Sequence, residues 1–119
     1  MIMKHYDSIV PDQLGIELKK AGYPQNLGNS WYNQDKSLDS LPFSDPLCAA
    51  PTYAEVFDWL LESKETAVNI SGIFLGPHYV WDWEVYTPKF HEWNECYETF
   101  EICACDAVEM ALKLLKRKK

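Results

Sequence analysis

Apolar residues recur three or four positions apart in three segments of the chain, the spacing that gathers them on one face of an α-helix. The first helix is expected over residues 11–21, followed by Gly22, which suits the left-handed position after a helix. The second is expected over residues 52–63 and the third over residues 99–115. The pattern therefore predicts three amphipathic helices, each with one buried face.

The second helix has the clearest start signal. Thr52 and Glu55 form the pattern of a capping box ahead of an apolar run. In such a box the threonine hydroxyl accepts a hydrogen bond from the backbone N–H of the glutamate, and the glutamate carboxylate reaches back to the threonine. We expect this pair to fix the first turn of the helix.

Between the second and third helices the hydrophobic period changes to two. Residues 68–74 and 79–86 alternate between the two faces of a strand, and Gly76-Pro77 between them is a turn signal. The alternation predicts an antiparallel hairpin with one buried face and one wetter face. We expect Trp81 and Trp83 to share the buried face, under the helices.

The rest of the chain gives weaker patterns. A second, short hairpin is expected over residues 30–38, an irregular crossing over residues 42–51, and a polar loop around His91. The resulting order, α-ββ-α-ββ-α, predicts an α+β fold: a small two-layer domain with about three helices packed on an antiparallel sheet. We expect a single domain over residues 1–119, with a short basic tail at 116–119.

The charge distribution limits the partners. The formal net charge is −7, and residues 116–119 hold four of the eleven basic residues, so the preceding chain carries seven bases against eighteen acids. Direct binding of DNA or RNA needs a basic surface and is not expected. No apolar run approaches the roughly 20 residues of a membrane span, and the first residues lack the apolar segment of a signal peptide. We therefore expect a cytoplasmic protein without membrane contact.

Short motifs in the predicted helices resemble those of a known family. Residues 18–23 read LKKAGY, residues 50–60 read APTYAEVFDWL, and residues 97–101 read YETFE, with the Trp31-Tyr32 pair between the first two. With these motifs the chain resembles a family of short uncharacterised proteins of gut bacteria, often found in prophage or other mobile regions. It departs from the family pattern at Ile102-Cys103, where Glu-Ala is usual. The resemblance implies the architecture of helices and hairpin, and it implies no activity, ligand or catalytic residue.

Candidate catalytic or metal-binding residues are few. His91 and Cys96 lie in the stretch with the densest titratable side chains, and they would suit a small hydrolase or a metal site if the fold brought them together. The chain contains no C-x-x-C or H-x-x-x-H pair and no phosphate-binding glycine loop. Without a metal site, the four cysteines, Cys48, Cys96, Cys103 and Cys105, are expected to act as small buried hydrophobes. We expect no enzyme activity, no metal and no cofactor.

The aromatic residues indicate a binding surface instead. Trp31, Tyr32, Tyr86 and Trp93 are expected in loops or on the wetter face of the sheet, as an aromatic patch surrounded by acids. Such patches are typical of protein–protein contacts, although large rings also serve to cover the second face of a small sheet. We expect a non-enzymatic interaction or accessory protein that binds a protein partner or forms a homodimer. Its charge leaves the alternative of an acidic nucleic-acid mimic that inhibits a DNA-binding enzyme.

Overall fold

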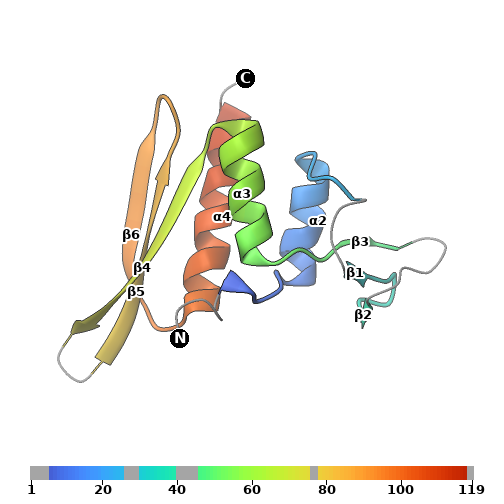
Figure 1. Ribbon diagram of the computed structural model, residues 1–119, viewed down its shortest axis with the longest axis horizontal. Coiled ribbons are helices and arrows are strands. Elements are labelled where there is room, and N and C mark those ends of the chain that lie inside the picture. Colours follow the sequence, from blue (N-terminus) through green and yellow to red (C-terminus); the bar gives the residue numbers. More distant parts are fainter. Residues whose placement is uncertain (1–5, 26–29, 40–45, 76–77, 118–119) are drawn as a thin grey trace. The chain divides into compact units, whose positions relative to one another are not determined.

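The computed structural model describes residues 6–25, 30–39, 46–75 and 78–117. The chain forms two compact units, residues 2–56 and residues 57–119, and the boundary lies inside helix α3. Each unit contains a three-stranded antiparallel sheet (Figure 1). The helices found among the described residues are α2, α3 and α4. The α+β class expected from the sequence is confirmed.

The unit of residues 2–56 combines helix α2 (Asp12–Lys20) with a small sheet. Strand β1 (Trp31–Tyr32) is central and pairs with β2 (Leu38–Asp39) on one side and β3 (Cys48–Ala49) on the other. The first helix and the short hairpin are confirmed. Strand β3 was expected to be irregular, and that prediction was wrong because a two-residue strand is too short to show an alternating pattern.

Gly15 allows helix α2 to approach strand β3 closely. A Cβ atom on Gly15 would lie 3.0 Å from the Sγ of Cys48 and 3.1 Å from the carbonyl oxygen of Ala49. The second of these atoms belongs to the backbone of the strand, so it cannot rotate away as a side chain can. Glycine is therefore needed at this position for packing rather than for backbone conformation.

Helix α3 (Tyr53–Lys64) begins with the expected capping box. The backbone N–H of Thr52 donates to Oε1 of Glu55 at 2.9 Å, and the backbone N–H of Glu55 donates to the hydroxyl of Thr52 at 3.2 Å. Two of the otherwise unpaired groups of the first turn are thus satisfied.

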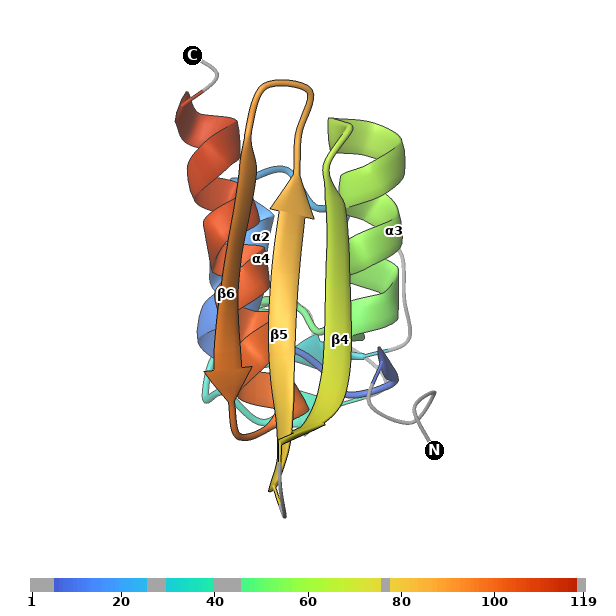
Figure 2. The ribbon, with the colours of Figure 1, turned by 90° about the vertical axis from the view of Figure 1, so that its left-hand side faces the viewer.

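The unit of residues 57–119 is built on a sheet whose strand order follows the chain. Strand β4 (Ala67–Leu75) pairs with β5 (His78–Tyr86), which pairs in turn with β6 (His91–Tyr97). Helix α4 (Phe100–Arg117) lies along one face of this sheet and contacts all three strands (Figures 1 and 2). The β4–β5 hairpin and the helix are confirmed, and the backbone N–H of Ile102 donates to the hydroxyl of Thr99 at the start of the helix, 3.2 Å away.

Strand β6 replaces the polar loop that the sequence predicted around His91. It is an edge strand, and its residues Glu92 and Asn94 pair with positions of β5 whose side chains face α4. Because an edge strand reaches water on its open side, polar residues are tolerated at both alternating positions, and the period of two disappears from the sequence. The prediction of a loop was therefore wrong.

The core of this unit lies between the sheet and α4. Trp81, Trp83 and Val85 face the helix from the central strand and are buried, as the alternation predicted. The ring of Trp81 meets that of Phe100 edge to face, with centroids 5.4 Å apart. The buried face of α4 is rich in small residues, which make room for the two indoles; they are Cys103, Ala104, Ala107, Val108 and Ala111.

Candidate functional site

The face of the β4–β5–β6 sheet that points away from α4 is the strongest candidate for a functional surface, and we call it the outer face. No described residue of the same unit covers it (Figure 2). Side chains alternate between the two faces of the sheet along each strand. Residues that pair with the buried positions of β5 therefore face α4, and the residues next to them in the same strand belong to the outer face. The outer face carries Asn69 and Ser71 from β4, Asp82, Glu84 and Tyr86 from β5, and His91, Trp93 and Glu95 from β6.

Three rings follow one another on the outer face. Tyr86 lies opposite His91 in the β5–β6 pairing, and the two rings stack with centroids 4.2 Å apart and planes 8° from parallel. The ring of His91 is followed by that of Trp93, at 5.3 Å. Trp93 is 65% exposed, the largest exposed fraction of any described tryptophan or tyrosine. The register of two strands therefore builds an aromatic row that the order of the residues along the chain conceals.

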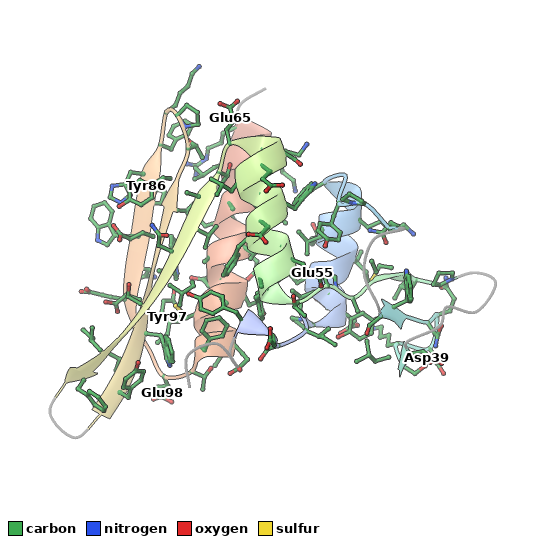
Figure 3. The ribbon with its side chains drawn as sticks, in the orientation of Figure 1. Asp39, Glu55, Glu65, Tyr86, Tyr97 and Glu98 are labelled. Carbon is green, nitrogen blue, oxygen red and sulfur yellow. The ribbon has the colours of Figure 1, made fainter. Side chains whose placement is uncertain are left out.

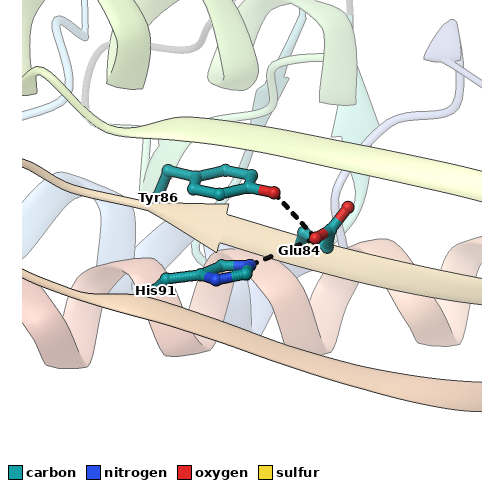
Figure 4. Close-up of polar contacts among 3 residues, drawn as sticks. All are labelled: Glu84, Tyr86 and His91. Carbon is teal, nitrogen blue, oxygen red and sulfur yellow. Dashed lines mark hydrogen bonds and ion pairs between the residues drawn. The ribbon is translucent and has the colours of Figure 1, made fainter.

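Glu84 holds two of these rings in place (Figure 4). Its Oε2 accepts hydrogen bonds from the hydroxyl of Tyr86 at 2.7 Å and from Nε2 of His91 at 3.1 Å. These bonds, first that of Tyr86 and then that of His91, hold the pKa of the Glu84 carboxyl below its usual value. The same carboxylate raises the pKa of the Tyr86 hydroxyl. The stacked pair is thus held in place by hydrogen bonds within the sheet itself.

A shallow hollow of about 150 Å³ lies beside the aromatic row. Its charged side chains are three carboxylates, and neither lysine nor arginine is among its lining residues. The lining residues are Asn69, Ser71, Asp82, Trp83, Glu84, Trp93, Asn94 and Glu95. The hollow therefore combines negative charge with the exposed face of an indole.

The structure places the four aromatic residues expected at a binding surface in two groups. Tyr86 and Trp93 lie on the outer face, and Trp93 is in a strand rather than a loop. Trp31 and Tyr32 belong to the other unit and are half-buried: the indole of Trp31 donates to the carbonyl of Gln25 at 3.0 Å, and the hydroxyl of Tyr32 donates to the carbonyl of Val10 at 2.7 Å. These internal bonds give Trp31 and Tyr32 a role in holding their own unit together.

The hydrolase or metal site drawn on His91 and Cys96 receives no geometric support. His91 is bonded to Glu84, and the side chain of Cys96 lies outside the described residues. Among the residues that the structure describes, no group of three His, Cys, Asp or Glu side chains is arranged to hold a metal ion. Cys103 is fully buried, and burial raises the pKa of its thiol to about 12, so it carries its proton at neutral pH.

A second polar cluster, on the inner side of the sheet, was not foreseen from the sequence. Oδ2 of Asp106 accepts hydrogen bonds from the hydroxyl of Tyr97 and from the indole of Trp83, the latter at 3.2 Å. Figure 3 shows Tyr97 on the side of the sheet that faces α4 and Tyr86 on the other side. Burial, and then the bond to Asp106, raise the pKa of Tyr97. The cluster satisfies the hydrogen-bond donor of a buried indole and fastens β6 to α4. Its signal in the sequence is Asp106, an acid one turn after Cys103 on a mostly apolar helix face.

Comparison with known proteins adds no assignment. No protein-family model, curated protein or solved structure matches the chain. The resemblance to short proteins of gut bacteria and their prophages stays a prediction from the sequence. In the described residues, no helix has the length and hydropathy required to cross a membrane.

Proposed function

We propose that this protein is a non-enzymatic binding module that docks a protein partner on the outer face of its β4–β5–β6 sheet. The observation that carries the proposal is the row of Tyr86, His91 and Trp93 on a sheet face that no described residue of its own unit covers. Tryptophan and tyrosine supply much of the binding energy at protein interfaces, because they bury a large area with few rotatable bonds.

The hydrogen bonds that hold the aromatic row in place support a role in binding rather than only in shielding the sheet from water. Glu84 fixes Tyr86 and His91 by hydrogen bonds, so these side chains lose little further conformational freedom when a partner binds. A ring that only shields backbone from water would lie flat and buried, whereas 65% of Trp93 is exposed. The role of an accessory protein in a bacterial or prophage system rests on the sequence resemblance alone.

Site-specific photo-crosslinking in the native cell tests this proposal. A photoreactive amino acid at Ser71, on the outer face, is expected to trap a discrete partner, and the same probe at Glu62, on the exposed side of α3, is not. Trp93→Ala is expected to abolish the trapped product. Leu61→Ala is the matched control, because Leu61 is a similarly exposed apolar side chain, 56% exposed, on α3.

The result that overturns the proposal is equally defined. If Ser71 and Glu62 give the same products, or if the product from Ser71 survives Trp93→Ala in a folded variant, the outer face is not a docking surface. Near-ultraviolet circular dichroism and the melting temperature establish that each variant is folded.

A further inference from the structure

The outer face is bordered by the open edge of strand β6. Strand β5 pairs with one side of β6, and among the described residues no strand pairs with its other side (Figure 2). Backbone N–H and C=O groups on such a side can pair with a further strand. The N–H of Glu95 is already occupied, because it donates to Oδ1 of Asn94 at 2.9 Å. The part of the edge that is open to a further strand therefore precedes Glu95.

The turn before β6 determines which backbone groups point to this edge. The N–H of Thr87 donates to the carbonyl of Phe90 at 2.8 Å, so these two residues form a hydrogen-bonded pair. Bonded and non-bonded pairs alternate along an antiparallel ladder, so the N–H and C=O groups of His91 and Trp93 point away from β5. The close stacking of His91 on Tyr86 fits a non-bonded pair, in which facing side chains approach each other most closely.

His91 and Trp93 thus provide both rings on the outer face and backbone groups at its edge. We infer that the protein binds its partner by strand addition: an extended segment of the partner pairs antiparallel with β6 at His91 and Trp93, with a lysine or arginine opposite Glu92. Main-chain hydrogen bonds then hold the segment, and its alternate side chains lie beside the two rings. This inference rests on the proposed function and names the conformation and charge of the partner's segment.

Glu92 selects a basic segment over a second copy of this chain. It is half-buried on the side of the sheet that faces α4, and it makes no ion pair with any residue that the structure describes. Two copies of β6 paired antiparallel through His91 and Trp93 would place Glu92 directly opposite Glu92. Like charges at such positions destabilise a strand pair, whereas opposite charges stabilise it. Charge complementarity therefore favours a different chain, with a basic residue at this position.

Amide hydrogen exchange of the full chain, with and without a peptide, tests the inference. In the free protein, the amides of Glu92 and Asn94 are expected to exchange slowly, and those of His91 and Trp93 quickly. Saturating acetyl-Thr-Val-Lys-Val-Thr amide is expected to slow exchange at His91 and Trp93 about fivefold or more, because each gains a main-chain bond. Methylation of both valine nitrogens removes the donors that face β6 and is expected to abolish binding. Methylation of the lysine nitrogen, which points away from β6, is expected to leave binding unchanged.

Variants of β6 separate backbone pairing from the ring and the charge. His91→Pro and His91→Ala both remove the imidazole, but only proline removes the N–H at the open edge, where proline is tolerated. The lysine peptide is expected to bind about fivefold more weakly to His91→Pro than to His91→Ala. Glu92→Lys is expected to reverse the preference, so that acetyl-Thr-Val-Glu-Val-Thr amide binds about two- to fivefold more tightly than the lysine peptide. Glu62→Lys, on the exposed side of α3, is expected to leave the preference for the lysine peptide unchanged.

The two proposals fail separately. Exchange at His91 and Trp93 that the lysine peptide does not slow, or equal binding of the two methylated peptides, overturns strand addition. If crosslinking from Ser71 depends on Trp93 but is equally strong in His91→Pro and His91→Ala, strand addition is wrong and the docking surface stands. If the amides of His91 and Trp93 become protected when the protein alone is concentrated, a second copy occupies the edge, and the assignment to a separate partner is overturned.

Discussion

Glu84 shows how one exposed carboxylate can order a surface. It is placed between the rings of two neighbouring strands and accepts a hydrogen bond from each. Both bonds favour the ionised form, so the order of the surface depends on the charge of this residue. The stacked rings are therefore tied to pH through a carboxylate on the surface of the sheet.

Tyr86→Phe is expected to raise the pKa of Glu84 toward its usual value, because the Tyr86 hydroxyl is the largest cause of the lowered value. Carboxyl-detected NMR titration measures this directly. His91→Phe, which removes the second donor and keeps a ring, is expected to raise the pKa of Glu84 by less. The reverse order of the two effects would contradict the hydrogen-bond arrangement described here.

The sign of the pH effect follows from the lowered pKa. In the wild type, the bonds of Glu84 contribute to stability above its unfolded pKa, near 4.5, and the contribution is lost as the pH falls through the lower folded value. Tyr86→Phe should therefore reduce the loss of stability on acidification. Denaturant midpoints at pH 7 and pH 3 measure the difference.

At the scale of the elements, the contact of α2 with β3 depends on the absence of one side chain. Gly15→Ala is expected to destabilise the protein by about 1–3 kcal/mol through overpacking, despite the gain of about 1 kcal/mol in helix propensity. The cause is the carbonyl oxygen of Ala49, 3.1 Å from the new Cβ. Urea denaturation measures the change, and Gln13→Ala on the exposed side of α2 serves as control. A Gly15→Ala variant as stable as the wild type would show that β3 can move away.

Side-chain hydrogen bonds to Asp106 hold β6 against α4. Asp106→Ala removes the acceptor shared by Tyr97 and Trp83, and it is expected to cost about 1–3 kcal/mol because two donors lose a partner. Hydrogen exchange should show faster opening of β6 than of β4. Lys113→Ala, on the exposed side of α4, is expected to leave both unchanged. A uniform loss of protection over the sheet would contradict the local role of Asp106.

The elements that the sequence predicted are those in which periodicity and end signals agree. Helix α3 has both an apolar stripe and the Thr52–Glu55 box, and β5 alternates large apolar residues with charged ones. Strand β6 escaped prediction because its polar positions face water at an edge, and β3 because it is only two residues long. For the candidate site, exposed aromatic residues were predictable as a type, but their stacking depends on a register that only the paired strands define.

At the scale of the whole molecule, charge distinguishes the proposed function from its alternative. An acidic mimic of nucleic acid would hold its target mainly by charge, so salt would speed dissociation as steeply as it slows association. A partner held by the aromatic row should dissociate at a rate that changes little with salt concentration. The net charge of −7 then acts mostly before contact, on the rate at which a partner approaches.

For the partner trapped from Ser71, we expect association to slow about tenfold between low and high salt, and dissociation to change by about twofold. Stopped-flow measurement over a series of salt concentrations gives both rates. Trp93→Ala is expected to speed dissociation at every salt concentration. Dissociation that rises with salt as steeply as association falls would favour the acidic mimic.

The order of the elements along the chain has a consequence for synthesis. Strands β4, β5 and β6 leave the ribosome before α4, the helix that covers their apolar face. A chain that ends before Phe100 lacks that helix, so Trp81 and Trp83 have no cover from it and two indoles face solvent. Such a truncated chain is a natural substrate for chaperones and proteases, so chains cut short just before α4 should accumulate less than the full chain.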